Sequence, residues 1–251
     1  MENRSKLFEG IVVLGHGMIK RKFQFYKEAL LHMLFPSLCF GCEENNVEEE
    51  EMICINCKLS LPYTSFEKIR NNTVEKLFWG RVPVLFSSST FYYREKTSIQ
   101  QIIHHIKYRD EKELGIFMGK MMGDRLRILL QENNTDICIP MPLHPSKEKK
   151  RGYNQASLLC EGMRQTTGIP YNDLVLERRI ATDTQTKKNR TARWSNVKDV
   201  FAINHPKRIQ NKNIVLVDDV ITTGASMEAC AHILLENGAN TVAITSLAYT
   251  V

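Results

Sequence analysis

Residues 214–217 (IVLV) form an uninterrupted apolar run that ends at two adjacent acids, Asp218 and Asp219. Such a run is typical of a strand buried on both faces, as in a parallel sheet. The stretch that follows, VITTGAS, leads into residues 225–237, which are predicted to form a helix ended by Gly238. This strand–turn–helix predicts an α/β chain with both acids at the carboxyl end of a strand, where ligands bind in open α/β sheets.

The rest of the chain alternates predicted strands with predicted helices. This alternation argues for a parallel sheet covered by helices. Strands are predicted over residues 82–93, 136–140 and 241–248, and helices over 97–107, 111–131 and 154–166. The helix at 111–131 is expected to line up Leu114, Met118, Met121, Arg125 and Leu129 along one side.

Composition bounds the class of protein. The 251 residues are 43% hydrophobic and 25% charged, which is ordinary for a globular protein and enough for one medium domain plus a small module. The formal charge of +6 is compatible with nucleic acid or phosphorylated ligands without being diagnostic. No run approaches the ~18 apolar residues of a membrane span, and the N-terminus lacks signal-peptide features. We therefore expect a cytoplasmic protein whose cysteines are metal ligands or buried thiols rather than disulfides.

The N-terminal region is expected to be separate from the α/β domain. Residues 18–35 have an apolar helical face mixed with basic residues. A basic amphipathic helix can contact a membrane or nucleic acid, but docking on its own protein is the favoured interpretation. We assign residues 1–35 to an N-terminal extension with this helix, 36–62 to a four-cysteine module and 82–251 to the α/β domain.

The four-cysteine module contains two Cys-x2-Cys pairs, Cys39/Cys42 and Cys54/Cys57, separated by 11 residues. Two such pairs can supply four thiolates to one tetrahedral Zn²⁺. A segment this short cannot bury a core, so the metal would supply the folding free energy. Coincidental pairs or a redox dithiol are the alternatives, but both pairs lie in one 19-residue window without an adjacent βαβ unit. The predicted zinc is structural, because four thiolates leave no open position for water.

Residues 222–226 (TTGAS) combine three hydroxyls with a glycine at the predicted start of a helix. Backbone N–H groups and the helix dipole there can form an anion site, although the stretch is neither a Walker A loop nor a Rossmann fingerprint. Ribose 5-phosphate suits both the anion site and the two acids, because its phosphate fits the anion site and its diol can donate to Asp218 and Asp219. The competing interpretation is an ordinary turn whose acids cap the helix.

VLVDDVITTGAS resembles the phosphoribosyl diphosphate (PRPP) signature of type I phosphoribosyltransferases. Residues 140–156 (PMPLHPSKEKKRGYNQA) and 178–201 (RRIATDTQTKKNRTARWSNVKDVF) are similar to segments of the ComF family, as are the four-cysteine module and IKYRD at 106–110. The resemblance covers about residues 33–251. Met141, Lys188 and the extra N-terminal segment depart from the family pattern, and none of them touches the signature. The implied fold is a type I phosphoribosyltransferase-like parallel sheet with flanking helices, preceded by a small zinc-binding module.

The resemblance implies PRPP with Mg²⁺ as the ligand. Asp218 and Asp219 would be the catalytic pair that holds the ribose diol, with one of them facing Mg²⁺ through water. The 5′-phosphate would be bound by the residues that follow: Val220, Ile221, Thr222, Thr223, Gly224, Ala225 and Ser226.

The same resemblance implies two segments for the pyrophosphate. The first is the turn after residue 140, with Met141, Pro142, Leu143 and His144. The second is a flexible loop whose basic residues suit a diphosphate leaving group, with Arg178, Lys187, Lys188, Arg190 and Arg193. Solvated basic residues are the alternative for any one of them. His144 is a ligand contact or a structural turn histidine, and Asn154 is an anion contact or a helix-start residue.

Two functions follow from the resemblance. The first is a ComF-type competence protein involved in DNA uptake and natural transformation, which binds single-stranded DNA and a ribose 5-phosphate or PRPP-like ligand. The second is an active phosphoribosyltransferase with an acceptor that the sequence does not identify. Other DNA-uptake proteins, such as a helicase, are further candidate partners, and a peripheral position at the inner face of the membrane is an alternative location. Five aromatic residues could join the basic loop in a surface for a single strand, although core packing is expected for most: Tyr92, Tyr93, Tyr108, Tyr153 and Trp194.

Overall fold

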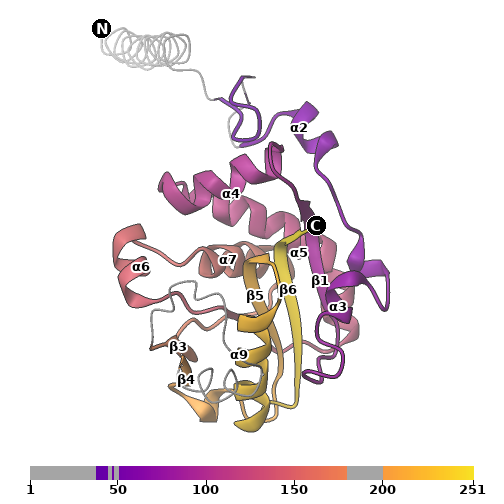
Figure 1. The fold of residues 1–251 in the computed structure, drawn as a ribbon, viewed down its shortest axis with the longest axis vertical. Helices are drawn as coiled ribbons and strands as arrows, with labels where there is room; N and C mark the ends of the chain where they lie inside the picture. The colour runs from indigo at the N-terminus through magenta and orange to yellow at the C-terminus, as the bar shows by residue number, and fades with distance from the viewer. Residues whose placement is uncertain (1–37, 45–46, 48–50, 180–199) are drawn as a thin grey trace, which may run out of the picture. The chain divides into compact units, whose positions relative to one another are not determined.

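The computed structural model describes residues 38–44, 47, 51–179 and 200–251, which divide between two compact units, Met1–Cys54 and Ile55–Val251 (Figure 1). In the first unit the chain turns around the first cysteine pair, where Glu43 N donates to Cys39 O at 2.8 Å and Phe40 N donates to Met52 O at 3.0 Å. The helix predicted over residues 18–35 lies outside the described residues. None of the described helices combines the length and apolar character that a membrane crossing requires.

The second unit is built on a four-stranded sheet in the order β1–β6–β5–β2, and every pairing in it is parallel. The predicted parallel sheet is therefore confirmed. Strands β5 and β6 extend further than their apolar runs predict, because Asp218 still pairs with Ser246 and Ile221 with Tyr249. The strand bounds are Ser87–Tyr93 for β1, Ile137–Pro140 for β2, Asn213–Ile221 for β5 and Thr241–Thr250 for β6.

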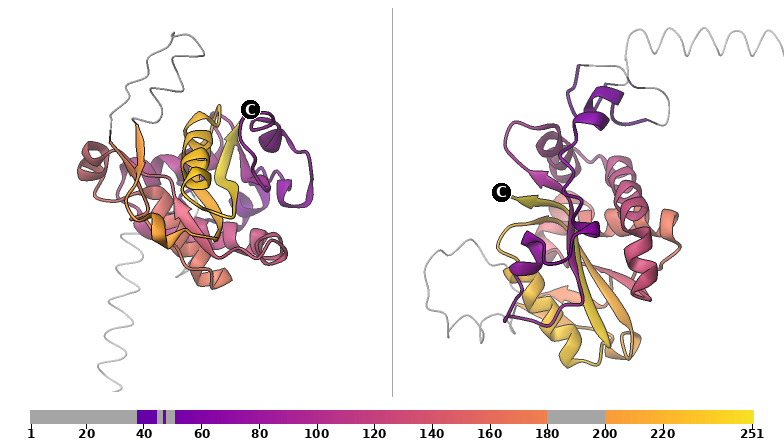
Figure 2. Two further views of the ribbon diagram at one scale, coloured as in Figure 1. Left: turned by 90° about the horizontal axis from the view of Figure 1, so that it is seen from below. Right: turned by 90° about the vertical axis from the view of Figure 1, so that its right-hand side faces the viewer.

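Helices cover both faces of this sheet (Figure 2). One face carries α4 (Ser98–Tyr108), α5 (Lys112–Glu132) and α7 (Gln155–Thr167), and the other carries α3 (Thr73–Lys76) and α9 (Ala225–Glu236). Shorter elements complete the unit: α2 (Ile55–Ser60), η1 (Phe66–Lys68), α6 (Pro145–Arg151), η2 (Pro206–Arg208), and the antiparallel pair β3 (Leu176–Arg178) and β4 (Phe201–Ile203).

Helices α5 and α7 approach closely because glycines line the buried face of α5. A Cβ on Gly119 would lie 2.3 Å from the carbonyl oxygen of Leu159, so a larger residue would separate the two helices. On the side predicted from the sequence, Leu114 and Met118 are buried, whereas Met121, Arg125 and Leu129 are only partly buried. The buried positions are Leu114, Gly115, Met118, Gly119, Met122, Gly123, Leu126 and Leu130.

The opposite face has a core to which an unexpected segment contributes. Residues 61–80 have the composition of a polar connector, yet Phe66, Val74 and Phe78 are buried in the cluster that also contains Leu216 of β5. This segment therefore reaches the sheet next to the start of α9, which places it beside the candidate ligand site.

Candidate functional site

Two adjacent carboxylates lie near the carboxyl end of β5. Asp219 forms an ion pair with Lys107 of α4, with 3.0 Å between Nζ and Oδ2, and the two side chains are only 16% and 24% exposed. The backbone N–H of Asp219 donates to Oδ1 of Asp218 at 2.8 Å. The sequence did not single out Lys107 as a site residue, although it lies within the IKYRD stretch that resembles the ComF family.

The electrostatics of this pair follow from burial. Burial and, to a smaller extent, repulsion from Asp219 raise the pKa of Asp218 to about 7, although the hydrogen bond from Asp219 N and the charges of Lys107 and Arg178 oppose the rise. A ligand that donates hydrogen bonds or brings a positive charge favours the ionised carboxylate. The pair is therefore suited to a diol or a cation, and it repels a bare anion.

A hydroxyl-rich loop begins two strand residues after the carboxylates. Val220 and Ile221 still belong to β5, and Ile221 is buried, so the solvent-open part begins at Thr222. Gly224 precedes α9 with φ 72°, and no side chain caps the helix there. The first N–H groups of a helix lack intrahelical partners, so this uncapped N-terminus can bind an anion. The exposed hydroxyls around it belong to Thr222, Thr223 and Ser226.

The segment before β1 packs against this loop through Phe78 and Arg81. A Cβ on Gly224 would lie 2.9 Å from two ring carbons of Phe78, which leaves room only for glycine. Arg81 donates through Nη1 to Thr223 O at 3.3 Å, and its guanidinium forms an ion pair with Glu228 in the first turn of α9. Sequence reasoning missed Phe78 and Arg81, since no local motif marks either residue.

The turn after β2 lies beside the carboxylates. Met141 N donates to Val217 O at 2.8 Å, and the Met141 side chain is buried in the core. His144 is the N-cap of α6 and accepts from Ser146 N at 3.2 Å, whereas Asn154 caps α7 and donates to Met141 O at 2.9 Å. Both His144 and Asn154 therefore make the helix-start hydrogen bonds that are their structural alternative.

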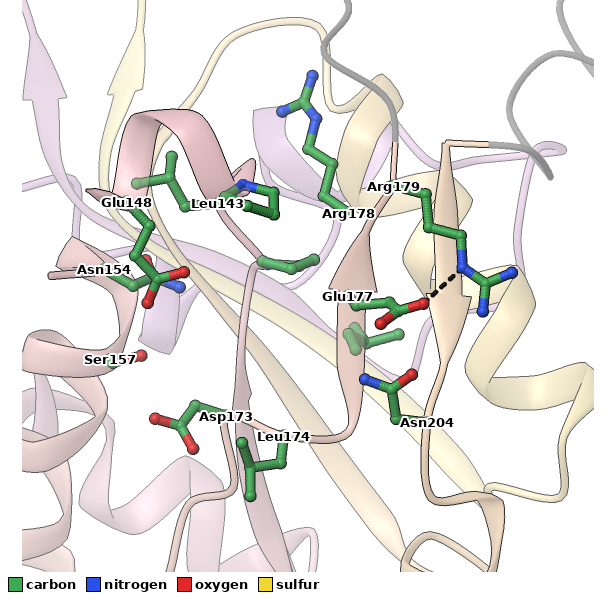
Figure 3. Close-up of a pocket in the computed structure, with 13 residues that line it drawn as sticks. Leu143, Glu148, Asn154, Ser157, Asp173, Leu174, Glu177, Arg178, Arg179 and Asn204 are labelled. Atoms are coloured by element: carbon green, nitrogen blue, oxygen red, sulfur yellow. Dashed lines mark hydrogen bonds and ion pairs between the residues drawn. The ribbon is translucent and has the colours of Figure 1, made fainter. Parts of the chain in front are cut away.

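A pocket of about 430 Å³ opens next to this turn (Figure 3). Arg178 of β3 lines it, and the same side chain acts electrostatically on Asp218 and lies 5.5 Å from the Phe201 ring. On the opposite side the side chains of Glu148, Ser157 and Asp173 come from three different segments. The full lining is Pro142, Leu143, Pro145, Glu148, Asn154, Ser157, Asp173, Leu174, Leu176, Glu177, Arg178, Arg179 and Asn204.

The structure thus brings the predicted residues together in two groups. Asp218, Asp219 and residues 222–226 follow one another at the end of β5, whereas Pro142, Leu143 and Arg178 line the neighbouring pocket. The remaining predicted loop residues, Lys187, Lys188, Arg190 and Arg193, lie outside the described residues.

The four cysteines of the N-terminal module form a cluster in which all sulfur atoms lie within 4.8 Å of one another. Cys39 Sγ accepts from the backbone N–H groups of Gly41 and Cys54, each at 3.2 Å, and Cys42 Sγ lies 4.0 Å from Cys54 Sγ. Sulfurs around a tetrahedral zinc, with Zn–S bonds of about 2.3 Å, are about 3.8 Å apart. The predicted four-cysteine cluster, which includes Cys57, is confirmed, and its donor set fits a metal such as zinc.

The other three cysteines are buried, as the sequence predicts. Cys138, Cys160 and Cys230 are all at most 1% exposed, and burial raises the pKa of the Cys138 thiol to about 12. These thiols are therefore core residues.

Comparison with known families defines the class of this domain. A family model described as "Phosphoribosyl transferase domain" matches residues 150–250, which include the carboxylate pair, the hydroxyl-rich loop and β6. With the parallel sheet and its flanking helices, this match defines a type I phosphoribosyltransferase fold, and the cysteine cluster precedes it in the chain.

Three curated proteins with similar sequences relate this chain to a more specific group. "DNA utilization protein YhgH" of Salmonella typhi is 29% identical over 154 residues, which cover 59% of this chain and 66% of the relative. "Competence protein F" of Haemophilus influenzae is 25% identical over 222 residues, covering 87% of this chain and 93% of that protein. "Competence protein ComFC" of Bacillus subtilis is 33% identical over 102 residues, covering 41% of this chain and 39% of that protein. These homologues confirm the resemblance to the ComF family, although the match with YhgH spans slightly less than two thirds of its length.

Solved structures with a partial likeness include an allosteric regulatory enzyme of purine biosynthesis, with a TM-score of 0.38 and 21% identity over 57% of this chain and 29% of that one. A purine phosphoribosyltransferase from Pyrococcus horikoshii gives a TM-score of 0.35 and 18% identity over 54% of this chain and 82% of that one. The fold assignment itself depends on the family match and the strand order.

Proposed function

We propose that this chain is a competence-related protein that binds PRPP, as its Mg²⁺ complex, at the carboxyl edge of the sheet and acts on DNA. One observation carries the PRPP part: two carboxylates near the end of β5 are followed within a few residues by an uncapped helix N-terminus with exposed hydroxyl residues. A ligand that suits both must carry hydroxyl donors and a phosphate on one small frame, and ribose 5-phosphate does so.

Each half of the site has a defined task in this proposal. Asp218 and Asp219 accept hydrogen bonds from the ribose diol, and Lys107 holds the Asp219 carboxylate in place through their ion pair. Residues 222–226 bind the 5′-phosphate through backbone N–H groups and hydroxyls. Carboxylate oxygens are also the donors that Mg²⁺ prefers, and the ion would supply charge neutralisation for the diphosphate.

The pyrophosphate part of PRPP is assigned to the neighbouring groups. Arg178 lines the pocket and acts electrostatically on Asp218, and Pro142 and Leu143 line the same pocket. The basic residues predicted at 187–193 would complete this part. Arginine is suited to the task because its guanidinium can bind two phosphate oxygens at once.

The DNA part of the proposal is supported by the names of the relatives. Proteins similar to this chain are called "DNA utilization protein" and "Competence protein". We extend that role to this chain, with single-stranded DNA as the nucleic acid, structural Zn²⁺ on the four cysteines and a cytoplasmic location. Other DNA-uptake proteins, such as a helicase, would then be its protein partners.

A series of ligands tests the PRPP part on the wild-type chain. Calorimetric titration with Mg²⁺ present should give an affinity order of PRPP, then ribose 5-phosphate, then 2-deoxyribose 5-phosphate and inorganic phosphate. The deoxy sugar lacks one hydroxyl donor and should lose about 1–3 kcal/mol, or roughly 5- to 150-fold, relative to ribose 5-phosphate. Equal affinity for ribose and deoxyribose 5-phosphates would contradict the diol contacts.

Transfer of ribose 5-phosphate to an acceptor is the second candidate function. The raised pKa of Asp218, about 7, favours it, because a carboxyl group with this pKa can exchange a proton near neutral pH. The test is pyrophosphate release from PRPP across a panel of nucleobases, with and without single-stranded DNA. Release with one base would establish transfer, whereas PRPP and DNA binding without release would leave a binding protein.

A further inference from the structure

Tyr108 is a large aromatic residue that the fold leaves outside the core. It is the last residue of α4 and is 67% exposed, whereas Ile99, Ile102 and Ile106 of the same helix are buried. Its neighbour in the chain, Lys107, forms the ion pair with Asp219, so Tyr108 is one residue away from a side chain of the proposed PRPP site. Core packing therefore does not explain Tyr108.

Two side chains from different elements lie against the Tyr108 ring. The His104 ring, one turn earlier in α4, has its centroid 5.0 Å away and is tilted by 46°. The Arg151 guanidinium, at the end of α6, lies 5.5 Å from the centroid of the Tyr108 ring. The junction is fixed by buried Tyr153, whose hydroxyl donates to Ile106 O at 2.6 Å. The cluster of His104, Tyr108 and Arg151 is therefore held by tertiary structure.

Helix α6 gives this cluster a basic flank. Helix α6 (PSKEKKR) carries four cations against one acid, whereas the segment from Lys107 to Glu113 (KYRDEKE) has three cations and three acids and is neutral overall. Cations in the last turn of a helix also favour its dipole, which alone could explain Lys149 and Lys150. The dipole does not explain an exposed tyrosine under an arginine. Exposed aromatics combined with a positive surface are the means by which proteins bind single strands, because bases stack on the ring while cations contact phosphates.

We propose that His104, Tyr108 and Arg151 form a stacking platform for single-stranded nucleic acid, which rests on the DNA part of the proposed function. The platform adjoins Lys107 and Asp219, so a strand bound there would place a nucleotide beside the sugar–phosphate site. Of the five aromatic residues named in the sequence analysis, only Tyr108 belongs to this platform. Tyr153 is buried and braces the junction, Tyr92 and Tyr93 are partly buried in β1, and Trp194 lies outside the described residues.

The test measures binding of a fluorescent oligothymidylate to the full chain by anisotropy at fixed salt. Tyr108→Ala should weaken binding by about 5- to 150-fold, the range for loss of one stacked base, while Tyr108→Phe should stay near wild type because the ring remains. Arg151→Ala should weaken binding and reduce the slope of log affinity against log salt by about 0.7, the value for one phosphate contact on a single strand.

Two matched controls exist elsewhere on the chain. Trp79 is a second exposed aromatic, 57% exposed, with the Lys76 ammonium 5.9 Å from its ring, so Trp79→Ala removes a similar pair from another surface. Lys207→Ala removes one exposed charge within η2, before the amino end of β5. Both should bind the oligonucleotide like wild type. Duplex DNA of the same length should bind without dependence on Tyr108, because its bases are not available for stacking.

The outcomes separate this inference from the function on which it rests. If the wild type binds the oligonucleotide and Tyr108→Ala and Arg151→Ala bind it equally well, the platform is wrong and the DNA role stands. If the wild type binds PRPP but no oligonucleotide, the platform and the DNA part both fail while the PRPP part survives. If the Tyr108 and Arg151 variants lose affinity for anionic lipid vesicles but not for DNA, the surface binds membranes and the platform is overturned. PRPP titration of the same variants should match wild type, which shows that they are folded.

Discussion

The cysteine cluster and the loop at residues 222–226 are both candidate ligand sites, but different forces hold them. In the described part of residues 38–54 the buried apolar side chains are few, and Cys39 and Cys54 are themselves among them. The loop instead follows a strand whose residues 214–217 are at most 1% exposed, and the buried ring of Phe78 supports it. A core of that kind can hold a binding site in shape before the ligand arrives.

The source of the folding free energy determines where the effect of a substitution should appear. In the cluster the ligand contributes the folding free energy, so loss of a ligand atom should appear as unfolding. In the loop the hydrophobic core contributes the folding free energy, so loss of a ligand contact should appear as weaker binding to a folded protein.

The largest effect is expected for Cys54→Ser. Zinc bound by such modules is worth about 10–16 kcal/mol of apparent folding free energy, so the variant should lose the metal and unfold the module. The α/β unit should keep its circular dichroism and its PRPP affinity. Metal analysis and limited proteolysis are the measurements, and Cys160→Ala, which removes a buried thiol elsewhere, should keep its metal. A wild-type chain purified under reducing conditions with far less than one zinc would contradict the assignment.

The next effect concerns Asp218 and pH. Its folded-state pKa is about 7, whereas an unfolded aspartate ionises near pH 3.9. Between these values the folded ligand-free chain holds a proton that the unfolded chain releases, so stability should fall as pH rises from about 4 to 7, by at most about 4 kcal/mol. Thermal melting should show a flatter pH profile for Asp218→Asn. Asp173→Asn, at an exposed acid, should keep the wild-type profile, and a steep profile that survives in Asp218→Asn would refute this origin.

Gly224→Ala should destabilise the loop through two separate causes. A residue with φ 72° is strained unless it is glycine, and the added Cβ would also meet Phe78 at 2.9 Å. Gly152→Ala is the matched control, because Gly152 has φ 83° but no atom within 4 Å of an added Cβ. We expect Gly152→Ala to cost about 1–2 kcal/mol and Gly224→Ala more than that. Calorimetric melting should show the difference, and equal losses would mean that Phe78 does not constrain the loop.

The smallest effect is expected for Arg81→Ala. Its ion pair with Glu228 is 38% exposed on the arginine side, so its loss should cost at most about 1 kcal/mol of stability. Phosphate should nevertheless bind a few-fold more weakly, since Thr223 O loses its donor. Arg127→Ala removes another exposed arginine, one that pairs with Asp124, and should leave phosphate binding intact. Equal phosphate affinity in both variants would remove Arg81 from the support of the loop.

The sequence predicted the parts of this site that are contiguous in the chain. The apolar run, Asp218, Asp219 and residues 222–226 follow one another, so one strand–turn–helix pattern contains them all. The two cysteine pairs were predictable for the same reason, since metal spacing is local. Both expectations depended on short-range chemistry, and the family match and the cysteine cluster confirm the fold and the cluster.

The site residues that the sequence did not predict come from segments far from residues 218–226 in the chain. Phe78 and Arg81 precede the loop by more than a hundred residues, and only the folded sheet brings them to Gly224 and Thr223. Lys107 could be found only through the ComF resemblance. The buried face of α5 includes Gly115, Gly119 and Gly123, which allow close helix packing but carry no hydrophobic signal in the sequence. Strands β3 and β4 have three residues each, which is too short for a periodic pattern.

The central claim, that two carboxylates hold a ribose diol beside a phosphate loop, is tested most directly by titrating Asp218→Asn and Asp219→Asn with two ligands. PRPP uses both halves of the site, so each variant should bind it roughly 5- to 150-fold more weakly, the equivalent of about 1–3 kcal/mol for donors left poorly paired. Inorganic phosphate uses only the loop, so its affinity should stay the same or rise slightly as repulsion falls. If both variants bind PRPP like the wild type, the diol assignment is wrong and the two acids are only a feature of the helix start.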